Sequence, residues 1–311
     1  MYISQDILAT IGNTPLIQLR KIPPDGSARI VVKLEGANPT GSMKDRMAKA
    51  MIEGAEADGR LKPGGKVAEF TGGSTGTSLA MICAVKGYPL SIVTSNAASP
   101  EKRSHMQALG ASMTVLYSEG AKVTNELFKA LTATTERIVK ETGAFWTDQF
   151  HNRNQLDGYL ALGKEVWEQT DGHVDAFVQV VGTCGSLRGV STTLRHLNSR
   201  LQVIAVEPAE SPVLGGGRPG SHRIEGVGLG ETPVLWDPAL VDAIEQVSTE
   251  EAEEMTRRLA REEGIFAGTS SGANVVAALR VAARLGPGAT VASVMVDNGL
   301  KYLSTTVFDQ V

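Results

Sequence analysis

Three glycine-rich loops contain the residues of this sequence best suited to chemistry. They are Thr71–Gly76 (TGGSTG), Gly182–Ser186 (GTCGS) and Gly268–Gly272 (GTSSG), and each follows an apolar run and precedes a helical pattern. At such a junction the first N–H groups of the helix lack partners and the helix dipole adds positive charge, so an anion can bind there. Although α/β turns often contain these residue types, three such loops in one chain favour anion binding.

Two nucleotide-binding motifs do not match these loops. The second loop lacks the G-x-G-x-x-G spacing of a dinucleotide site, and Gly226–Gly230 follows no convincing strand. Gly36–Gly41 has the separation of P-loop glycines, but Ser42 stands where a P-loop requires lysine. We therefore expect neither a Rossmann dinucleotide nor nucleotide hydrolysis.

The first and third loops also fit the G-x-S-x-G pattern of serine hydrolases. Ser74 or Ser270 would be the nucleophile, and the catalytic histidine would follow it in the chain. The last of the five histidines is His222, so none follows Ser270. Serine hydrolysis stays open as an alternative.

Lys44 lies in a polar segment, Gly36–Arg46 (GANPTGSMKDR), at the point where a helical pattern begins. A helix N-terminus disfavours an ammonium charge, which predicts a lowered pKa for Lys44 and an amine available as a nucleophile. A solvated surface lysine is the ordinary alternative.

The elements that must position these residues indicate an α/β fold. Short β-branched runs alternate with longer helical patterns, which predicts two lobes of mostly parallel open sheets with helices on both faces. Ser248 and Glu251 have capping-box spacing before a helix that Gly264 ends. We expect eight strands, at 30–34, 66–70, 90–94, 113–117, 145–150, 176–181, 202–207 and 290–297.

Composition excludes several classes of protein. Hydrophobic residues make up 42% and charged residues 21% of the 311, as in soluble globular proteins, and no stretch reaches the roughly 18 apolar residues of a membrane span. The net charge is −4 without a run of like charges, so we expect no nucleic-acid or membrane partner. The only cysteines, Cys83 and Cys184, lack metal-ligand spacing, which predicts no metal site, no disulfide framework and a cytoplasmic location.

Six segments, in this order and spacing, resemble the pyridoxal-phosphate-dependent enzymes of the cysteine synthase (O-acetylserine sulfhydrylase) family, which have fold type II. They span nearly the whole chain: IGNTPL at 11–16, KLEGANPTGSMKDR at 33–46, the three glycine-rich loops, and KYLST at 301–305. The resemblance implies a transferase of cysteine biosynthesis with pyridoxal 5′-phosphate as cofactor. It would replace the β-substituent of an activated serine with sulfide or a thiol to form L-cysteine or an analogue. Alternatives on the same scaffold are cystathionine synthesis, cysteine desulfhydration or a catalytically idle binding protein.

The resemblance also assigns roles to individual residues. Lys44 is similar to the lysine that holds the cofactor as a Schiff base and removes the substrate α-proton, and Ser270 to a serine that bonds the pyridine nitrogen. The implied cofactor-binding residues are Lys44, Ser74, Gly182, Thr183, Cys184, Gly185, Ser186 and Ser270. The implied substrate-binding residues are Thr71, Gly72, Gly73, Ser74, Thr75, Gln149 and Gly226.

Several positions depart from the family pattern. Ser74 replaces an asparagine found in many relatives, and His151–Asn154 stands where a proline is expected. Cys184 replaces a glycine, which predicts a position without positive φ and a packed rather than a reactive thiol. Arg218 and Arg223 are near the site in sequence, but neither is obviously committed to a phosphorylated substrate, which favours O-acetylserine over O-phosphoserine.

The family's architecture implies a domain division and an assembly. Residues 1–44 and 151–311 would form a larger cofactor-binding lobe, and residues 45–150 a smaller inserted lobe that closes over the substrate. Homodimers are usual in such enzymes, so we expect a homodimer here.

Overall fold

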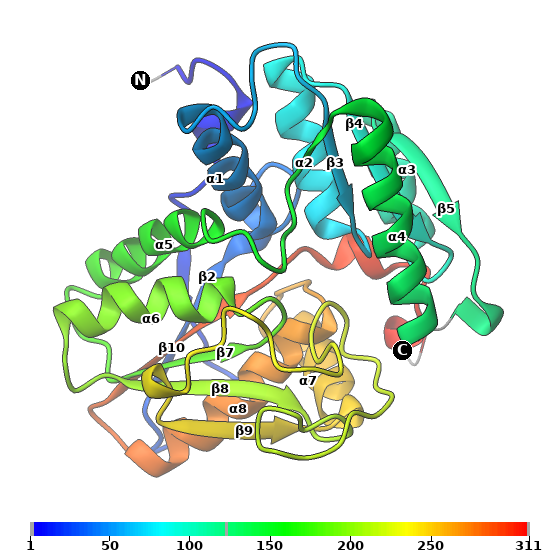
Figure 1. Ribbon diagram of the computed structural model, residues 1–311. Helices are drawn as coiled ribbons and strands as arrows, with labels where there is room; N and C mark the ends of the chain where they lie inside the picture. Colours follow the sequence, from blue (N-terminus) through cyan, green and yellow to red (C-terminus); the bar gives the residue numbers. More distant parts are fainter. Residues whose placement is uncertain (1–2, 122–123, 310–311) are drawn as a thin grey trace.

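The computed structural model describes residues 3–121 and 124–309, whose strands form two sheets (Figure 1). In the larger sheet only β1 and β2 pair antiparallel, and every other neighbouring pair is parallel. Its order is β1 (Leu16–Gln18), β2 (Arg29–Leu34), β10 (Thr290–Met295), β7 (Ala176–Val180), β8 (Gln202–Pro208) and β9 (Ala243–Val247).

The smaller sheet is parallel throughout. Its order is β5 (Ser112–Leu116), β4 (Leu90–Ser95), β3 (Val67–Phe70) and β6 (Phe145–Trp146). Eight α-helices of the described residues connect the strands: α1 (Lys44–Ala57), α2 (Ser74–Lys86), α3 (Pro100–Ala108), α4 (Asn125–Thr142), α5 (Gln155–Gln169), α6 (Gly185–Leu197), α7 (Thr249–Glu262) and α8 (Thr269–Leu285).

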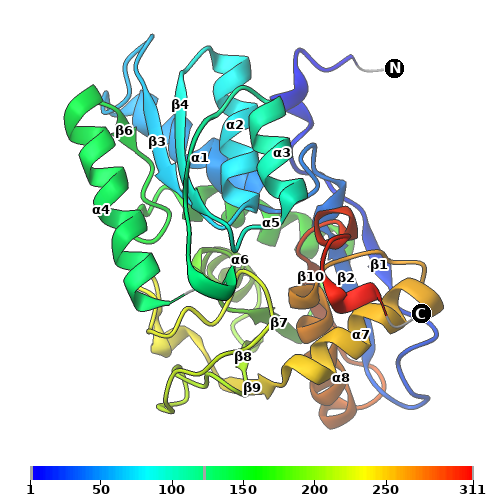
Figure 2. The same cartoon turned by 90° about the vertical axis from the view of Figure 1, so that its right-hand side faces the viewer.

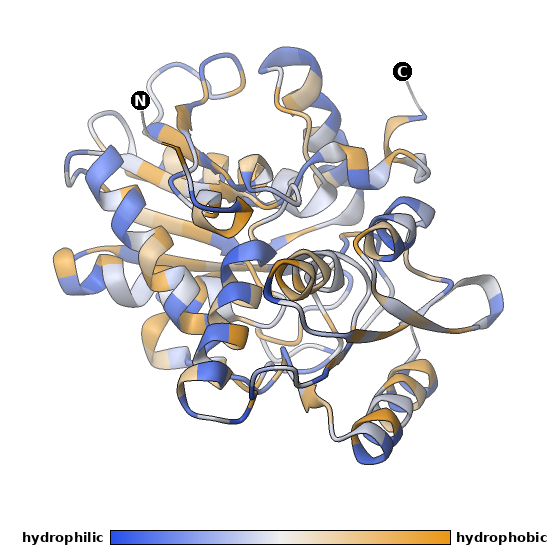
Figure 3. Cartoon of the chain, turned by 90° about the horizontal axis from the view of Figure 1, so that it is seen from above, coloured by the Kyte–Doolittle hydropathy of each residue, from blue (hydrophilic) through white to orange (hydrophobic). Residues whose placement is uncertain are grey.

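Helices cover both faces of each sheet because the strands are apolar on both faces. In β7, Val178 packs into a core with α7 and α8, whereas Phe177 packs into a core with α5 and α6. In the smaller sheet, Ile92 packs on the side of α1 and α2, and Val93 on the side of α4, as Figure 2 shows for the helices. In Figure 3 several strands are coloured as hydrophobic along much of their length, whereas most helices alternate between hydrophobic and hydrophilic residues. The predicted α/β architecture of mostly parallel sheets is therefore confirmed.

Two kinds of strand prediction were wrong. The strand predicted at 145–150 ends at Trp146, because the chain turns at Asp148, where φ is 45°. The strands β1 and β9 were not predicted, because β1 has three residues and only Val247 of β9 is buried. The predicted capping box of Ser248 and Glu251 is present at the start of α7.

No helix among the described residues is long and apolar enough to cross a membrane. The described residues also contain no group of three or more His, Cys, Asp or Glu side chains that could hold a metal ion.

Candidate active site

The Lys44 segment and the first and third glycine-rich loops contact the end of β10. The N–H of Met43 donates to Val296 O at 2.9 Å, which places Lys44 beside this strand end. The N–H of Val296 donates to Ser271 Oγ at 2.9 Å, which attaches the third glycine-rich loop to the same point. Ser74 Oγ, from the first loop, lies 3.3 Å from Asp297 Oδ2. Because parallel strands end at one edge of a sheet, residues from distant parts of the chain meet here.

Lys44 is the first residue of α1 and is partly buried. Burial lowers its pKa to about 8, Asp297 opposes that change and Lys102 adds to it. The direction agrees with the prediction from the helix N-terminus, but the main cause is burial. About half of the Lys44 side chains are therefore neutral, and able to act as a nucleophile, near pH 8.

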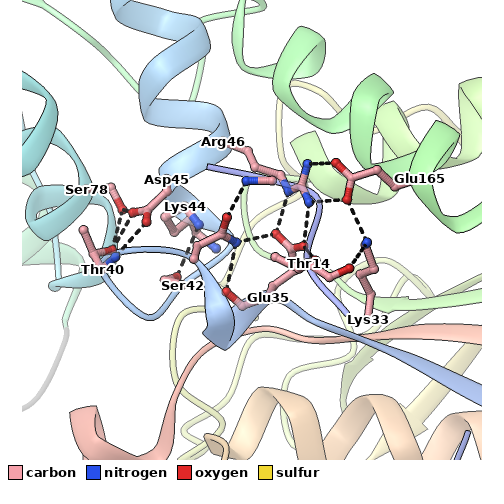
Figure 4. Close-up of polar contacts among 12 residues, drawn as sticks. Thr14, Lys33, Glu35, Thr40, Ser42, Lys44, Asp45, Arg46, Ser78 and Glu165 are labelled. Atoms are coloured by element: carbon pink, nitrogen blue, oxygen red, sulfur yellow. Dashed lines mark hydrogen bonds and ion pairs between the residues drawn. The ribbon is translucent and has the colours of Figure 1, made fainter. Parts of the chain in front are cut away.

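The two residues after Lys44 fix the start of α1 on opposite sides (Figure 4). The Asp45 carboxylate accepts hydrogen bonds from the N–H of Thr40 at 2.8 Å and from Ser78 Oγ at 2.6 Å. The Arg46 guanidinium donates to both oxygens of Glu35 at 2.7 and 2.8 Å. These contacts hold the backbone on both sides of Lys44 in place.

Arg46 belongs to a buried charge network that spans β2, α1 and α5. Its guanidinium also donates to the two oxygens of Glu165 at 2.7 and 2.8 Å. Lys33 Nζ, which is fully buried, lies 2.7 Å from Glu165 Oε2. Glu35 additionally accepts a hydrogen bond from Thr14 Oγ1 at 2.6 Å. Sequence reasoning missed this network, although Lys33, Glu35 and Arg46 stand in one of the segments that carry the family resemblance.

The second loop presents open backbone amides at the start of α6. The N–H groups of Gly182, Thr183 and Cys184 have no hydrogen-bond partner among the described residues. A Cβ on Gly182 would lie 2.5 Å from Gly226 O, so this position has room only for glycine and the Gly226 segment lies against the loop. An anion that binds here would meet several N–H donors at once.

Cys184 corrects one prediction and confirms another. Its φ is 68°, so the position does adopt the left-handed conformation that the sequence was predicted to avoid there. A left-handed residue directly before a helix turns successive N–H groups toward one space, which is how the loop comes to expose its amides. Cys184 is 3% exposed, and burial raises the pKa of its thiol to about 12, as expected of a packed side chain.

The first loop also has open backbone amides, and it contacts Gln149. The N–H groups of Gly72 and Ser74 have no partner among the described residues. Gly73, with φ of 147°, lies against Lys102, since its Cβ would be 3.0 Å from Lys102 Cγ. Thr75 Oγ1 donates to Gln149 Oε1 at 2.7 Å, so the structure brings Gln149 and this loop together. Thr71 is buried at the end of β3.

In the third loop, part of the backbone is bonded within the loop itself. The N–H groups of Ser271 and Gly272 donate to Gly268 O at 3.0 and 3.3 Å and are therefore not open. Ser270 is 2% exposed, and its hydroxyl has no hydrogen-bond partner among the described residues. Among the residues that the structure describes, no histidine forms a hydrogen bond with Ser74 or Ser270. These residues therefore do not form the catalytic triad of a serine hydrolase.

Charged groups that sequence reasoning missed surround the first loop. Asp297 is 3% exposed, and its Oδ2 accepts from Tyr302 Oη at 2.7 Å. Lys102 Nζ pairs with Glu225 Oε2 at 2.5 Å and lies 4.4 Å from the centre of the Tyr302 ring. Lys301 is buried without a hydrogen-bond partner in the described chain, and burial lowers its pKa. The KYLST segment was a signal for Lys301 and Tyr302, whereas Lys102 and Glu225 lie in no recognised motif.

Glu69 holds the segment that contains Gln149. Its carboxylate is fully buried and accepts hydrogen bonds from Thr147 Oγ1 at 2.6 Å, the N–H of Gln149 at 3.1 Å and Trp146 Nε1 at 3.3 Å. Burial raises the pKa of Glu69 to about 7, although these hydrogen bonds favour the anion.

The site fits a ligand with both a carbonyl carbon and an anionic group. Lys44 supplies an amine that is about half neutral near pH 8, and the loops before α2 and α6 supply unpaired amides. Pyridoxal phosphate has an aldehyde for the amine and a phosphate for one of the loops. The fold and the site thus define a class of enzyme that attaches a carbonyl cofactor to a lysine between two α/β sheets.

Comparison with known proteins identifies the family. The family model described as "Pyridoxal-phosphate dependent enzyme" matches residues 7–297. The cysteine synthase of Staphylococcus aureus strain N315 is 40% identical over 305 residues, covering 97% of this chain and 96% of the relative. The chain belongs to the pyridoxal-phosphate-dependent enzymes of the cysteine synthase family, with fold type II.

Solved structures agree with this assignment. O-acetyl serine sulfhydrylase isoform 3 from Entamoeba histolytica has a TM-score of 0.93 and 37% identity, covering 100% of this chain and 93% of that one. An O-acetylserine-dependent cystathionine beta-synthase from Helicobacter pylori has a TM-score of 0.91 and 30% identity, covering 99% of this chain and 100% of that one. The protein is therefore a pyridoxal-phosphate-dependent enzyme.

Proposed function

We propose that the protein forms L-cysteine by β-replacement on an activated serine with sulfide or a thiol. The observation that carries this proposal is Lys44, whose pKa is about 8, at the strand end that the open first loop also reaches through Ser74 and Asp297. The similarity to the Staphylococcus aureus cysteine synthase supports the choice of reaction. When bound, pyridoxal phosphate withdraws electrons from the amino-acid substrate, so that the α-proton and then the β-substituent can leave.

The proposed cofactor-binding groups are the Lys44 amine and, for the most part, groups whose N–H or O–H has no partner in the described chain. Lys44 would hold the cofactor, and the amides of Gly182–Ser186 would hold its phosphate. The unpaired hydroxyl of Ser270 would bond the pyridine nitrogen as a neutral partner. Ser74 would reach the cofactor with a shorter side chain than asparagine, and its hydroxyl is already directed to Asp297 at 3.3 Å.

The substrate carboxylate would bind at the first loop, Thr71–Thr75, through its open amides. Gln149 Nε2 donates one proton to Phe70 O at 3.0 Å, so its second N–H is available to the same carboxylate. The Thr75 hydroxyl donates its hydrogen bond to the Gln149 side chain, and this bond orients the Gln149 amide group toward the loop. Gly226 would line the mouth of the site beside Gly182.

Proton transfer would use the Lys44 amine. As a free amine, Lys44 would be able to accept the α-proton of the substrate, and a pKa of about 8 suits that transfer near neutral pH. Burial is the main cause of this lowered pKa, while Asp297 favours the ammonium and Lys102 disfavours it.

The charges around the site favour O-acetylserine as donor. Lys102 is paired with Glu225, and the charges that act on Lys301 include both Asp297 and Asp45. Arg223, in turn, pairs with Glu253 at 2.8 Å at the surface. With its cations opposed by carboxylates, the site offers little excess positive charge to a phosphoryl group, whereas a neutral acetyl group needs none.

Closure of the smaller lobe belongs to the same proposal. Residues 45–150 would move toward the larger lobe, formed by residues 1–44 and 151–311, and exclude water from the substrate. The Lys102–Glu225 pair supports this, because it joins α3 to the segment that contains Gly226. We further propose that the enzyme works as a homodimer in the cytoplasm.

The test is product analysis with purified enzyme and pyridoxal phosphate. We expect L-cysteine from O-acetylserine and sulfide, a slower reaction with O-phosphoserine, and loss of activity and of the lysine-bound cofactor absorbance in Lys44→Ala. Wild-type enzyme that binds pyridoxal phosphate but converts neither donor would refute the proposal.

Cystathionine synthesis is the second candidate, because the Helicobacter pylori neighbour is an O-acetylserine-dependent cystathionine beta-synthase. Replacing sulfide with homocysteine in the same assay distinguishes the two reactions. Faster formation of cystathionine than of cysteine would favour this second function.

A further inference from the structure

Gln155 is a buried polar residue to which the proposed reaction gives no role. It is the first residue of α5, and no part of it is exposed. Its Nε2 donates to Gln149 O at 2.7 Å and to Asn152 O at 2.8 Å. Its Oε1 accepts from Thr183 Oγ1 at 2.9 Å. A single carboxamide thus uses both amide hydrogens and its oxygen, and every partner lies in one of two segments next to the site.

The first of these segments is the candidate phosphate loop. Thr183 stands in that loop, and its hydroxyl is oriented by Gln155. Gly185 faces the same side chain, since a Cβ there would lie 2.9 Å from Gln155 Cδ and 3.0 Å from Gln155 Cγ. The Gln155 carboxamide therefore leaves no room for a side chain at position 185.

The second segment contains the candidate substrate residue Gln149. Glu69 fixes its N–H at 3.1 Å and Gln155 fixes its carbonyl at 2.7 Å, so the backbone of Gln149 is held on both sides. Asp148, just before it, has a φ of 45°, a conformation that needs support from its neighbours. Asn152, the other acceptor, belongs to the His151–Asn154 segment that departs from the family pattern.

We infer that Gln155 is a positioning residue that joins the cofactor-phosphate loop to the substrate-carboxylate segment, so that ordering one segment orders the other. This inference rests on the proposed roles of Gly182–Ser186 and Gln149. Loss of the carboxamide would leave the Thr183 hydroxyl, the buried Gln149 carbonyl and the partly buried Asn152 carbonyl without their partner. It would also separate cofactor binding from the geometry around Gln149.

The variant that tests this inference is Gln155→Met, which keeps the length of the side chain and removes its hydrogen bonds. The dissociation constant of pyridoxal phosphate and the KM of the amino-acid donor should each rise about fivefold or more, as expected when buried hydrogen bonds lose a partner, with a smaller change in kcat. Gln202→Met, at an exposed position at the start of β8, is the matched control and should change neither constant.

Hydrogen–deuterium exchange of the full chain, with and without pyridoxal phosphate, provides a readout that is independent of activity. In the wild type, removing the cofactor should speed exchange at 147–154 as well as at 182–187. In Gln155→Met, exchange at 147–154 should already be fast and should not respond to the cofactor. If Gln155→Met does not fold, Thr183→Val should produce the same uncoupling, and Thr183→Ser, which keeps the hydroxyl, should restore the coupling.

Two results would overturn the inference. One is wild-type exchange at 147–154 that is indifferent to the cofactor. The other is a Gln155→Met protein with a lower melting temperature but unchanged cofactor affinity and KM, which would mean a purely structural role. If the wild type binds pyridoxal phosphate but makes no cysteine, the proposed function fails, whereas the cofactor-affinity and exchange measurements still decide the role of Gln155.

Discussion

Glu165→Gln should destabilise the protein by an amount that the geometry of the buried network predicts. The carboxylate of Glu165 is only 14% exposed and lies 2.7 Å from both Arg46 and Lys33. Burial alone would raise its pKa, but hydrogen bonds and charge from these two cations lower it from the usual 4.5 to about 2. Since each tenfold change in proton affinity is worth about 1.4 kcal/mol, the folded state gains about 3 kcal/mol from the ionised form.

The direction of the pH dependence follows from this lowered pKa. Unfolded Glu165 loses its proton near pH 4.5 and folded Glu165 near pH 2, so the stabilisation is complete above about pH 5 and is lost as the pH falls toward 2. Glutamine cannot ionise, so the difference between variant and wild type should be largest at pH 7 and should shrink to roughly half or less by pH 3.

Thermal unfolding at several pH values measures this difference. With an unfolding entropy of about 2.1 cal/mol/K per residue, a loss of 3 kcal/mol in a chain of 311 residues lowers the melting temperature by about 5 °C. Glu168→Gln is the matched control on the same helix, because Glu168 is exposed and 3.7 Å from Lys164, and it should change little. A difference for Glu165→Gln that is below 1 °C at pH 7, or that does not shrink on acidification, would refute the reasoning.

Three further predictions concern titratable groups. The pKa of Lys44 is about 8, so capture of pyridoxal phosphate by the apo-enzyme should speed up as the pH rises through 8; a rate that is flat between pH 6 and 9 would contradict this. Burial raises the pKa of both Cys83 and Cys184 to about 12, so neither thiol should react with a disulfide reagent until the protein is unfolded. Burial raises the pKa of Glu69 to about 7, so between pH 4.5 and 7 the folded state keeps a proton that the unfolded state releases. The free energy of unfolding should therefore fall as the pH rises from 4.5 to 7. If Glu69→Gln shows the same slope of unfolding free energy against pH, Glu69 is not the cause.

Much of the fold was predictable because its signals are local. The buried strands of parallel sheets are continuous apolar runs, so β3, β7 and β8 were predicted within a residue or two of their observed ends. The edge strands β1 and β9 carry little of that signal because they bury few residues. The turn at Asp148 depends on contacts made by its neighbours, and its sequence gave no sign of it.

The sequence by itself determined which residues can do the chemistry. Glycine-rich starts of α2 and α6 and a lysine at the start of α1 are properties of short segments, and their open amides follow from where each helix begins. The order and spacing of six short segments were enough to identify the family.

Only the tertiary structure decided which residues surround that chemistry. Ser74 and Asp297 are 223 positions apart and meet because β10 lies between β2 and β7 at the centre of the larger sheet. Lys102 and Glu225, 123 positions apart, pair because α3 reaches the segment around Gly226. Burial then sets the pKa values of Lys44 and Glu69, and burial is a property of the packed chain that no short segment contains.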